Sequence, residues 1–128
     1  MSSAALTENA IGRWHEVVNS KDLDGACRAV SDPIVVNGPK GVGPITPAGF
    51  ADWITRSGIE MRAKSWHPIN DRVMVVEQEA RWPQSKGWSR LATVFRATDD
   101  RVSAALRFPD LRAALTFAYL CAELAATE

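Results

Sequence analysis

The sequence has no excess of charge of either sign. Its 15 lysine and arginine residues balance its 15 aspartate and glutamate residues, and neither kind forms runs. Binding to nucleic acid or to an anionic membrane surface draws on a concentrated positive charge. We therefore expect no nucleic-acid partner and no membrane partner.

The chain also lacks a long apolar segment. Its most apolar tract, residues 111–126, is interrupted by Arg112 and Glu123 and is shorter than the ~20 residues that span a bilayer. The first ten residues have no basic start and no sustained apolar stretch, so they do not resemble a secretory signal. We expect a soluble cytoplasmic protein.

Cysteine is scarce, with only Cys27 and Cys121 in 128 residues. Neither has a histidine or a second cysteine at the spacing of metal ligands, so we expect no metal ion and no cofactor. Both fall within apolar helical patterns, which predicts buried free thiols. The length fits one domain, spanning residues 1–128.

Four segments place apolar residues at helical spacing: 7–20, 23–30, 47–57 and 111–127. Asp22, Thr46 and Asp110 precede three of them as N-caps. Pro47 suits a first helical position and Gly58 suits a helix end, so the third helix has the clearest boundaries.

The stretch from Ile59 to Pro109 predicts four consecutive antiparallel strands at residues 59–69, 71–82, 88–97 and 101–108. Short turns separate them, so we expect them to pair in sequence order. A β-branched strand at 34–37 and an irregular hairpin ending at Ile45 come before the third helix.

Pairing across residues 83–87 divides the second and third long strands into two faces. The outer face carries Glu77, Glu79, Arg81, Arg90 and Arg96 together with Val73, Val75, Ala92 and Val94. This is more apolar surface than a monomer usually leaves in water, which predicts a homodimer formed through the outer sheet face. The inner face carries Val76, Gln78, Ala80, Trp82, Leu91, Thr93 and Phe95.

This order of elements, and the segment WHEVVNSKDLDGACRAVSDPIVV from Trp14 to Val36, resemble SnoaL-like polyketide cyclases and ketosteroid isomerases. The segment is the most legible part of the resemblance, and its turn with Asn19, Asp22 and Gly25 marks the family without being a catalytic motif. It implies the nuclear transport factor 2-like (NTF2-like) fold. This is an α+β fold in which a cone-shaped, curved antiparallel sheet wraps around three N-terminal helices and is followed by a C-terminal helix.

The resemblance also implies where catalytic groups would lie. The isomerase base would fall at Gly38, the tyrosine at Trp14 and the protonated acid at Thr93, and this sequence replaces all three. Glycine takes up no proton, and general-base catalysis needs a basic group within reach. The predicted inner faces also lack the aspartate of the cyclases, the Asp-Arg-Asp set of epoxide hydrolases and the paired histidines of dehydratases.

We therefore expect a mainly apolar cavity that binds a small hydrophobic or carbonyl-bearing molecule without the known catalysis of the family. Trp14, Trp53 and Phe95 would form apolar walls, although aromatic stripes at helical spacing also serve as plain core. Gln78 and Thr93 would need polar partners, from a ligand or from the chain itself.

Three further residues are candidates for the same cavity. An inward Arg107 would require an anion, whereas a surface Arg107 would pair with Asp110 or Glu79. Asn37 can orient a carbonyl group. His15 is a weaker candidate, as a proton shuttle at the edge of the helical stripe.

Two other functions stay open. One is an enzyme of isomerase, cyclase or dehydratase type with relocated catalytic residues at His15, Asn37, Thr93 or Arg107. The other is a protein-interaction module with a filled core. A void near Trp14 and Thr93 would count against the filled core, and a carboxylate beside His15 or Arg107 would favour the enzyme.

Overall fold

The structure is a computed structural model that describes residues 3–38 and 41–127. In chain order the elements are α1 (Ser3–Ser20), α2 (Leu23–Ala29), β1 (Val30–Gly38), β2 (Gly41–Ile45), α3 (Pro47–Ser57), β3 (Glu60–Pro68), β4 (Val73–Arg81), β5 (Ser89–Thr98), β6 (Arg101–Phe108) and α4 (Leu111–Ala126).

Local capping interactions set the helix boundaries where the sequence predicts them. The Thr46 hydroxyl accepts a hydrogen bond from the Gly49 amide at 3.0 Å, at the start of α3. Gly58 ends the same helix with a left-handed φ of 60°, a conformation that glycine adopts without steric cost. The Asp110 carboxylate accepts from the Ala113 amide at 2.8 Å, at the start of α4.

The described strands form one six-stranded sheet in the order β2-β1-β6-β5-β4-β3. β3 to β6 pair antiparallel in sequence order, which confirms the predicted meander. β1 pairs antiparallel with β2 and parallel with β6, so the first and last strands of the chain lie side by side.

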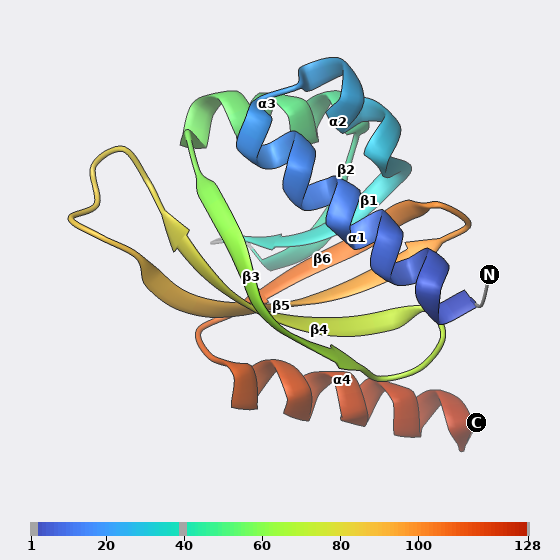
Figure 1. The fold of residues 1–128 in the computed structure, drawn as a ribbon. Helices are drawn as coiled ribbons and strands as arrows, with labels where there is room; N and C mark the ends of the chain where they lie inside the picture. Colours follow the sequence, from blue (N-terminus) through green and yellow to red (C-terminus); the bar gives the residue numbers. More distant parts are fainter. Residues whose placement is uncertain (1–2, 39–40, 128) are drawn as a thin grey trace.

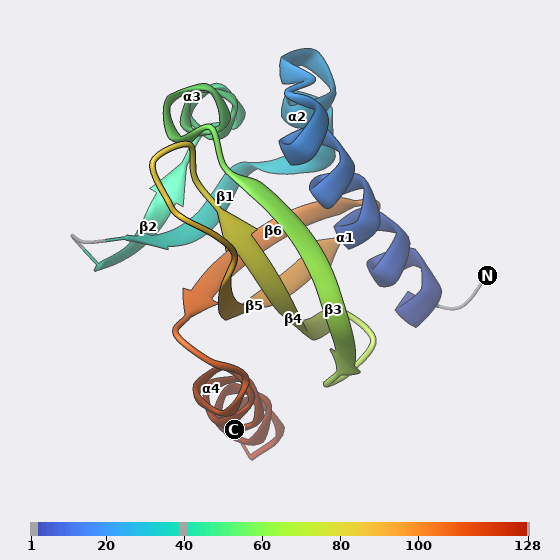
Figure 2. The same cartoon turned by 60° about the vertical axis from the view of Figure 1, so that its left-hand side comes forward.

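The sheet is curved and open, and helices cover both of its faces (Figure 1). α1, α2 and α3 lie on one side and α4 lies alone on the other, an arrangement that the turned view in Figure 2 also shows. The predicted α+β class, with three N-terminal helices and a C-terminal helix, is confirmed.

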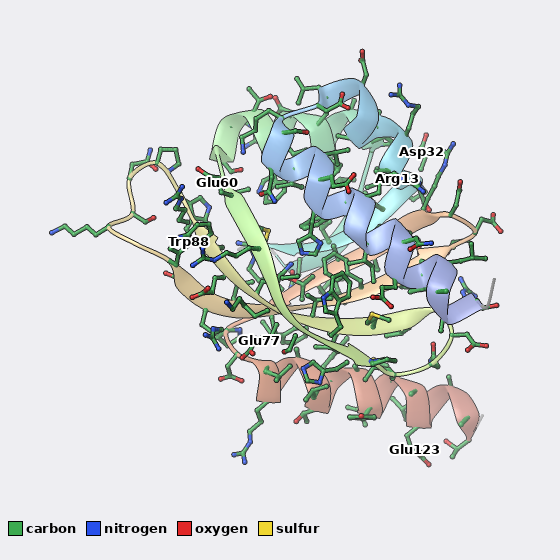
Figure 3. The ribbon with its side chains drawn as sticks, in the orientation of Figure 1. Arg13, Asp32, Glu60, Glu77, Trp88 and Glu123 are labelled. Atoms are coloured by element: carbon green, nitrogen blue, oxygen red, sulfur yellow. The ribbon has the colours of Figure 1, made fainter. Side chains whose placement is uncertain are left out.

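The strand register confirms the predicted assignment of faces. Val76 pairs with Thr93 and Gln78 with Leu91, and all four side chains are buried toward α1 to α3. Figure 3 shows Glu77, which belongs to the opposite face, on the side of the sheet that faces α4. Its carboxylate lies 3.4 Å from Arg90 of β5, one of the cross-strand charge pairs that the alternation predicts.

The apolar part of the outer face is covered by the chain's own last helix. Val75, Ala92 and Val94 form one buried cluster with Ala114 and Ala118 of α4. The expectation that this surface is left exposed for a second copy was therefore wrong. The error has a physical cause. The apolar pattern of α4 predicts that one side of the helix is buried, but it does not identify the surface on which that side packs.

The expected burial of the two cysteines is also corrected. Cys121 is exposed on α4 and Cys27 is half-buried. None of the helices in residues 3–38 and 41–127 is both long enough and apolar enough to cross a bilayer.

Candidate functional site

A cavity of about 420 Å³ lies between the inner face of the sheet and the N-terminal helices. Its walls come from α1, β1, β2, α3, β3, β5 and β6, and they are Trp14, Ile34, Val36, Asn37, Gly38, Ile45, Gly49, Phe50, Asp52, Trp53, Arg56, Met61, Thr93, Ala105 and Arg107. Its volume falls within the range usual for small-molecule sites.

Aromatic rings from two helices form one wall of the cavity. Trp14 of α1 stacks on Phe50 and on Trp53 of α3, with ring centroids 5.9 and 6.4 Å apart. The indole N–H of Trp14 is buried and has no acceptor among the described residues. The wall is therefore apolar, with one unused hydrogen-bond donor.

Arg107 of β6 brings a cation to this apolar space. Its guanidinium lies over the rings of Trp53 and Trp82, 5.9 and 5.7 Å from their centroids, within the range of cation–π attraction. Burial lowers the pKa of Arg107, although an arginine keeps its charge under all ordinary conditions. Among the described residues, no carboxylate lies within 4.0 Å of its nitrogen atoms.

The two surface partners that the sequence suggested for Arg107 are used elsewhere. Glu79 pairs with Arg62 at 3.0 Å and with Lys64 at 3.5 Å, and Asp110 caps α4. The interpretation of Arg107 as a paired surface arginine was therefore wrong.

Asn37 fixes the backbone of Arg107. Its Nδ2 donates to the Arg107 carbonyl and its Oδ1 accepts from the Arg107 amide, both at 2.8 Å. The Asn37 amide thus extends the parallel pairing of β1 and β6 by one residue. In this structure it therefore holds the backbone of Arg107 in place beside the cavity.

Thr93 is the cavity end of a buried chain of hydrogen bonds. Its hydroxyl donates to Gln78 Oε1 at 2.6 Å, and Gln78 Nε2 lies 2.8 Å from His15 Nε2. His15 Nδ1 lies 2.9 Å from the carbonyl of Ile11, one helical turn earlier in α1. Gln78 and Thr93 therefore have the polar partners that burial requires.

The donor and acceptor in each of these hydrogen bonds follow from the Ile11 carbonyl and from the protonation state of His15. The Ile11 carbonyl only accepts, so His15 Nδ1 must carry a proton. Burial lowers the pKa of His15, against the opposing effect of its bond to Ile11, so the ring is neutral near pH 7 and Nε2 accepts from Gln78. The Gln78 carbonyl then faces Thr93, whose hydroxyl hydrogen is committed to it.

The structure brings most of the predicted residues to one place. Trp14, Asn37, Trp53, Thr93 and Arg107 line the cavity. The other three lie behind its wall: Gln78, Phe95 and His15 are buried at 0%, 0% and 8% exposure. Phe95 meets the edge of Trp14, with centroids 4.9 Å apart, and so supports the aromatic wall from behind.

Sequence reasoning missed the polar pair at the cavity rim. Asp52 and Arg56 of α3 line the cavity and bind each other, with Arg56 Nε 2.6 Å from Asp52 Oδ2. A signal was present, because Gly49, Trp53 and Arg56 recur at the spacing of one helix face with Asp52. Gly38, the position that the resemblance matches to the isomerase base, also lines the cavity.

Comparison with known proteins finds likeness in structure and none in sequence. No family model matches the chain, and no curated protein matches it. An NTF2-like protein of unknown function from Cytophaga hutchinsonii superposes with a TM-score of 0.70 at 8% identity, covering 85% of this chain and 94% of that one.

Two further solved structures carry descriptions that name an enzyme class. An LEH-like epoxide hydrolase from Mycobacterium tuberculosis has a TM-score of 0.70 at 14% identity, over 94% of this chain and 89% of its own. A candidate polyketide cyclase from Sinorhizobium meliloti has a TM-score of 0.67 at 11% identity, over 84% of this chain and 100% of its own.

These likenesses identify the fold. The chain has the NTF2-like fold, and its structural neighbours include candidate polyketide cyclases and an LEH-like epoxide hydrolase. The NTF2-like fold that the resemblance implied is confirmed. Because neighbours with this one fold carry different activities, the function has to be argued from the cavity.

Proposed function

We propose that this protein binds a small hydrophobic or carbonyl-bearing molecule in the cavity beside Trp14 and Thr93, and that it does so without the catalysis of its enzymatic neighbours. The observation that carries the proposal is the cavity itself: a space of about 420 Å³ with mainly apolar walls and a few polar groups. Sites for small molecules have this composition, since apolar walls give affinity and a few polar groups give orientation.

The same space counts against the interaction module with a filled core. A chain whose core served only to support a surface would gain stability by filling such a void, because each missing contact costs packing energy. The void lies next to Trp14 and Thr93, where a ligand cavity was expected.

The chemistry of the lining supports binding ahead of acid–base catalysis. Asp52 is the one carboxylate among the described lining residues, and no histidine is among them. The Asp52 side chain is 62% exposed and is paired with Arg56. General-base catalysis needs a free basic group within reach of the substrate, whereas this carboxylate is exposed and already bound to Arg56.

Titration with 2-acetonaphthone, a neutral aromatic ketone, tests the proposal. Quenching of tryptophan fluorescence should saturate, since Trp14 and Trp53 are in the wall, with a Kd of roughly 1 mM or tighter for a ligand of this size. Ala105→Phe places a ring in the cavity and should abolish the binding.

Ala125→Phe is the matched control, because Ala125 is exposed on α4 and lies outside the lining. It should bind the ketone like the unmodified protein. Absence of saturable binding, or equal binding by the Ala105→Phe variant, would contradict the proposal.

The predicted homodimer and cytoplasmic location stay predictions. Since α4 covers the apolar outer face, a dimer on that side would form through α4, where Tyr119, Leu120 and Leu124 are exposed. Sedimentation at high micromolar concentration would show the mass of two chains, and the mass of one chain would refute the dimer.

A further inference from the structure

We propose that the ligand is an amphipathic hydroxy acid with three parts: an apolar body, an anionic group that binds Arg107, and a hydroxyl that donates to Thr93. This inference rests on the proposed function, because it concerns the same cavity. It goes further in that it fixes the charge of the ligand and the direction of one hydrogen bond.

The first support is the uncompensated cation. Arg107 is partly buried, lacks a carboxylate partner among the described residues, and is held through its backbone by Asn37. A buried guanidinium without an anion is costly, whereas a carboxylate makes paired, charge-assisted hydrogen bonds with it. A ligand carboxylate would therefore supply the anionic partner that Arg107 lacks among the described residues.

The second support is the position of Thr93. It is directly opposite Arg107 in the pairing of β5 with β6, and both side chains line the cavity. Side chains that face each other across antiparallel strands start about 4.5–5.5 Å apart at Cβ. One ligand can therefore reach both side chains, with a hydroxyl at Thr93 and its anionic group at the Arg107 guanidinium.

The third support is the polarity of the buried chain behind Thr93. His15 and Gln78 fix the Thr93 hydroxyl as a donor to Gln78 Oε1, so only its lone pairs are free for a ligand. Thr93 then accepts a hydrogen bond from the ligand, and Arg107 donates several. A hydroxy acid presents this combination of acceptor and donor.

The remaining walls indicate the body of the ligand. Trp14, Phe50 and Trp53 offer ring faces, and Ile34 and Met61 add aliphatic surface. The Asn37 amide is engaged with the Arg107 backbone. A flat aromatic or alicyclic body therefore suits the cavity better than a sugar-like one, whose hydroxyls would lack partners.

Three matched probes test the inference by calorimetry at pH 7: 2-naphthylglycolate, 2-naphthylacetate and 2-naphthylacetamide. The first has the acid and the hydroxyl, the second has the acid alone, and the third is neutral. The acetate should bind about tenfold or more tighter than the acetamide, because hydrogen bonds to charged groups are the stronger ones. The glycolate should gain a further factor of about 2–10.

Substitutions test which residue causes the preference for the acid and which causes the gain from the hydroxyl. Arg107→Met should remove the preference for acetate over acetamide, while Arg112→Met, which removes an exposed charge on α4, should keep it. Thr93→Val should remove the gain of the glycolate, and Thr93→Ser should keep it. Each comparison is made between probes on one variant, so a loss of stability in that variant does not affect it.

The possible failures are distinguishable. If the acetamide binds but the acids bind no better, the inference fails and the proposed function stands. If none of the three probes binds, both fail. If Arg56→Met at the cavity rim removes the acid preference and Arg107→Met does not, the anion binds at the rim and the inference is overturned.

Discussion

The two faces of the sheet are covered in different ways. On the outer face, the small side chains of Ala114 and Ala118 let α4 approach Val75, Ala92 and Val94 closely, and all five residues are at most 6% exposed. On the inner face, large aromatic residues of α1 and α3 stack on one another and leave a cavity of about 420 Å³ above the strands.

Polar groups are also placed differently on the outer and inner faces of the sheet. On the outer face, one group of them lies at the solvent-exposed end of the sheet, where Figure 3 labels Trp88 and Glu60. Arg62 and Arg81 lie 3.9 and 4.5 Å from the centroid of the Trp88 ring, and Arg81 pairs with Glu60 at 3.1 Å. Inside, Thr93 and Arg107 border an apolar space. The outer face is thus built for stability, and the inner face retains features that cost stability, which the proposed ligand binding would explain.

The largest expected effect comes from a charge placed under α4. Ala118→Asp would bury a carboxylate against the outer face, where Ala118 is 2% exposed, and should lower the free energy of unfolding by about 3 kcal/mol or more. Thr116→Asp puts the same charge on an exposed position of the helix and should change stability by less than about 0.5 kcal/mol. Urea unfolding followed by circular dichroism measures both, and equal small effects would mean that α4 is not packed on the sheet.

The same Ala→Leu substitution should lower stability by different amounts on the two faces of the sheet. Ala114→Leu overpacks the filled outer face, where Ala114 is 0% exposed, and should cost about 1–3 kcal/mol. Ala105→Leu extends into the cavity and should cost less than about 1 kcal/mol. Unfolding free energies of the two variants provide the test, and a larger loss for Ala105→Leu would contradict the contrast between a filled and a hollow layer.

The sequence predicts well what local interactions decide. The Asp22 side chain accepts from the Gly25 amide at 3.0 Å, as a cap should, and the strands from β3 to β6 follow their alternating pattern. Both depend on residues close together in the chain. The parallel pairing of β1 with β6 joins residues about seventy positions apart, such as Val36 and Ala105, and no periodicity reports it.

The sequence predicts toward which face of the sheet a side chain points, but it does not predict whether that side chain reaches the cavity. Alternation shows that Gln78, Thr93 and Phe95 point to one side of the sheet, yet only Thr93 reaches the cavity, because α1 covers the other two. Whether a side chain meets a helix or a void depends on the distance between layers. That distance follows from the packing of all the rings together, so single positions do not reveal it.

The smallest expected effect is a pH dependence of the unfolding free energy, which we expect from buried His15 on the inner face. Burial lowers the pKa of His15 in the folded chain, so below about pH 6.5 an unfolded histidine binds a proton that the folded one refuses. Stability should therefore be complete above this pH and fall as the pH drops through it, by at most about 1.4 kcal/mol per pH unit for one group.

His15→Phe should remove this slope. It should also lower stability by about 1–3 kcal/mol at every pH, because the Gln78 amide loses its acceptor. His67→Asn alters the other histidine, which bonds to Ser65 on β3 at 2.8 Å, and should keep the slope. Urea unfolding at pH 5.5 and pH 8 separates the variants. If His15→Phe kept the slope and His67→Asn lost it, the proton that destabilises the fold would enter outside the buried chain, and the fixed direction of the Thr93 hydroxyl would lose its support.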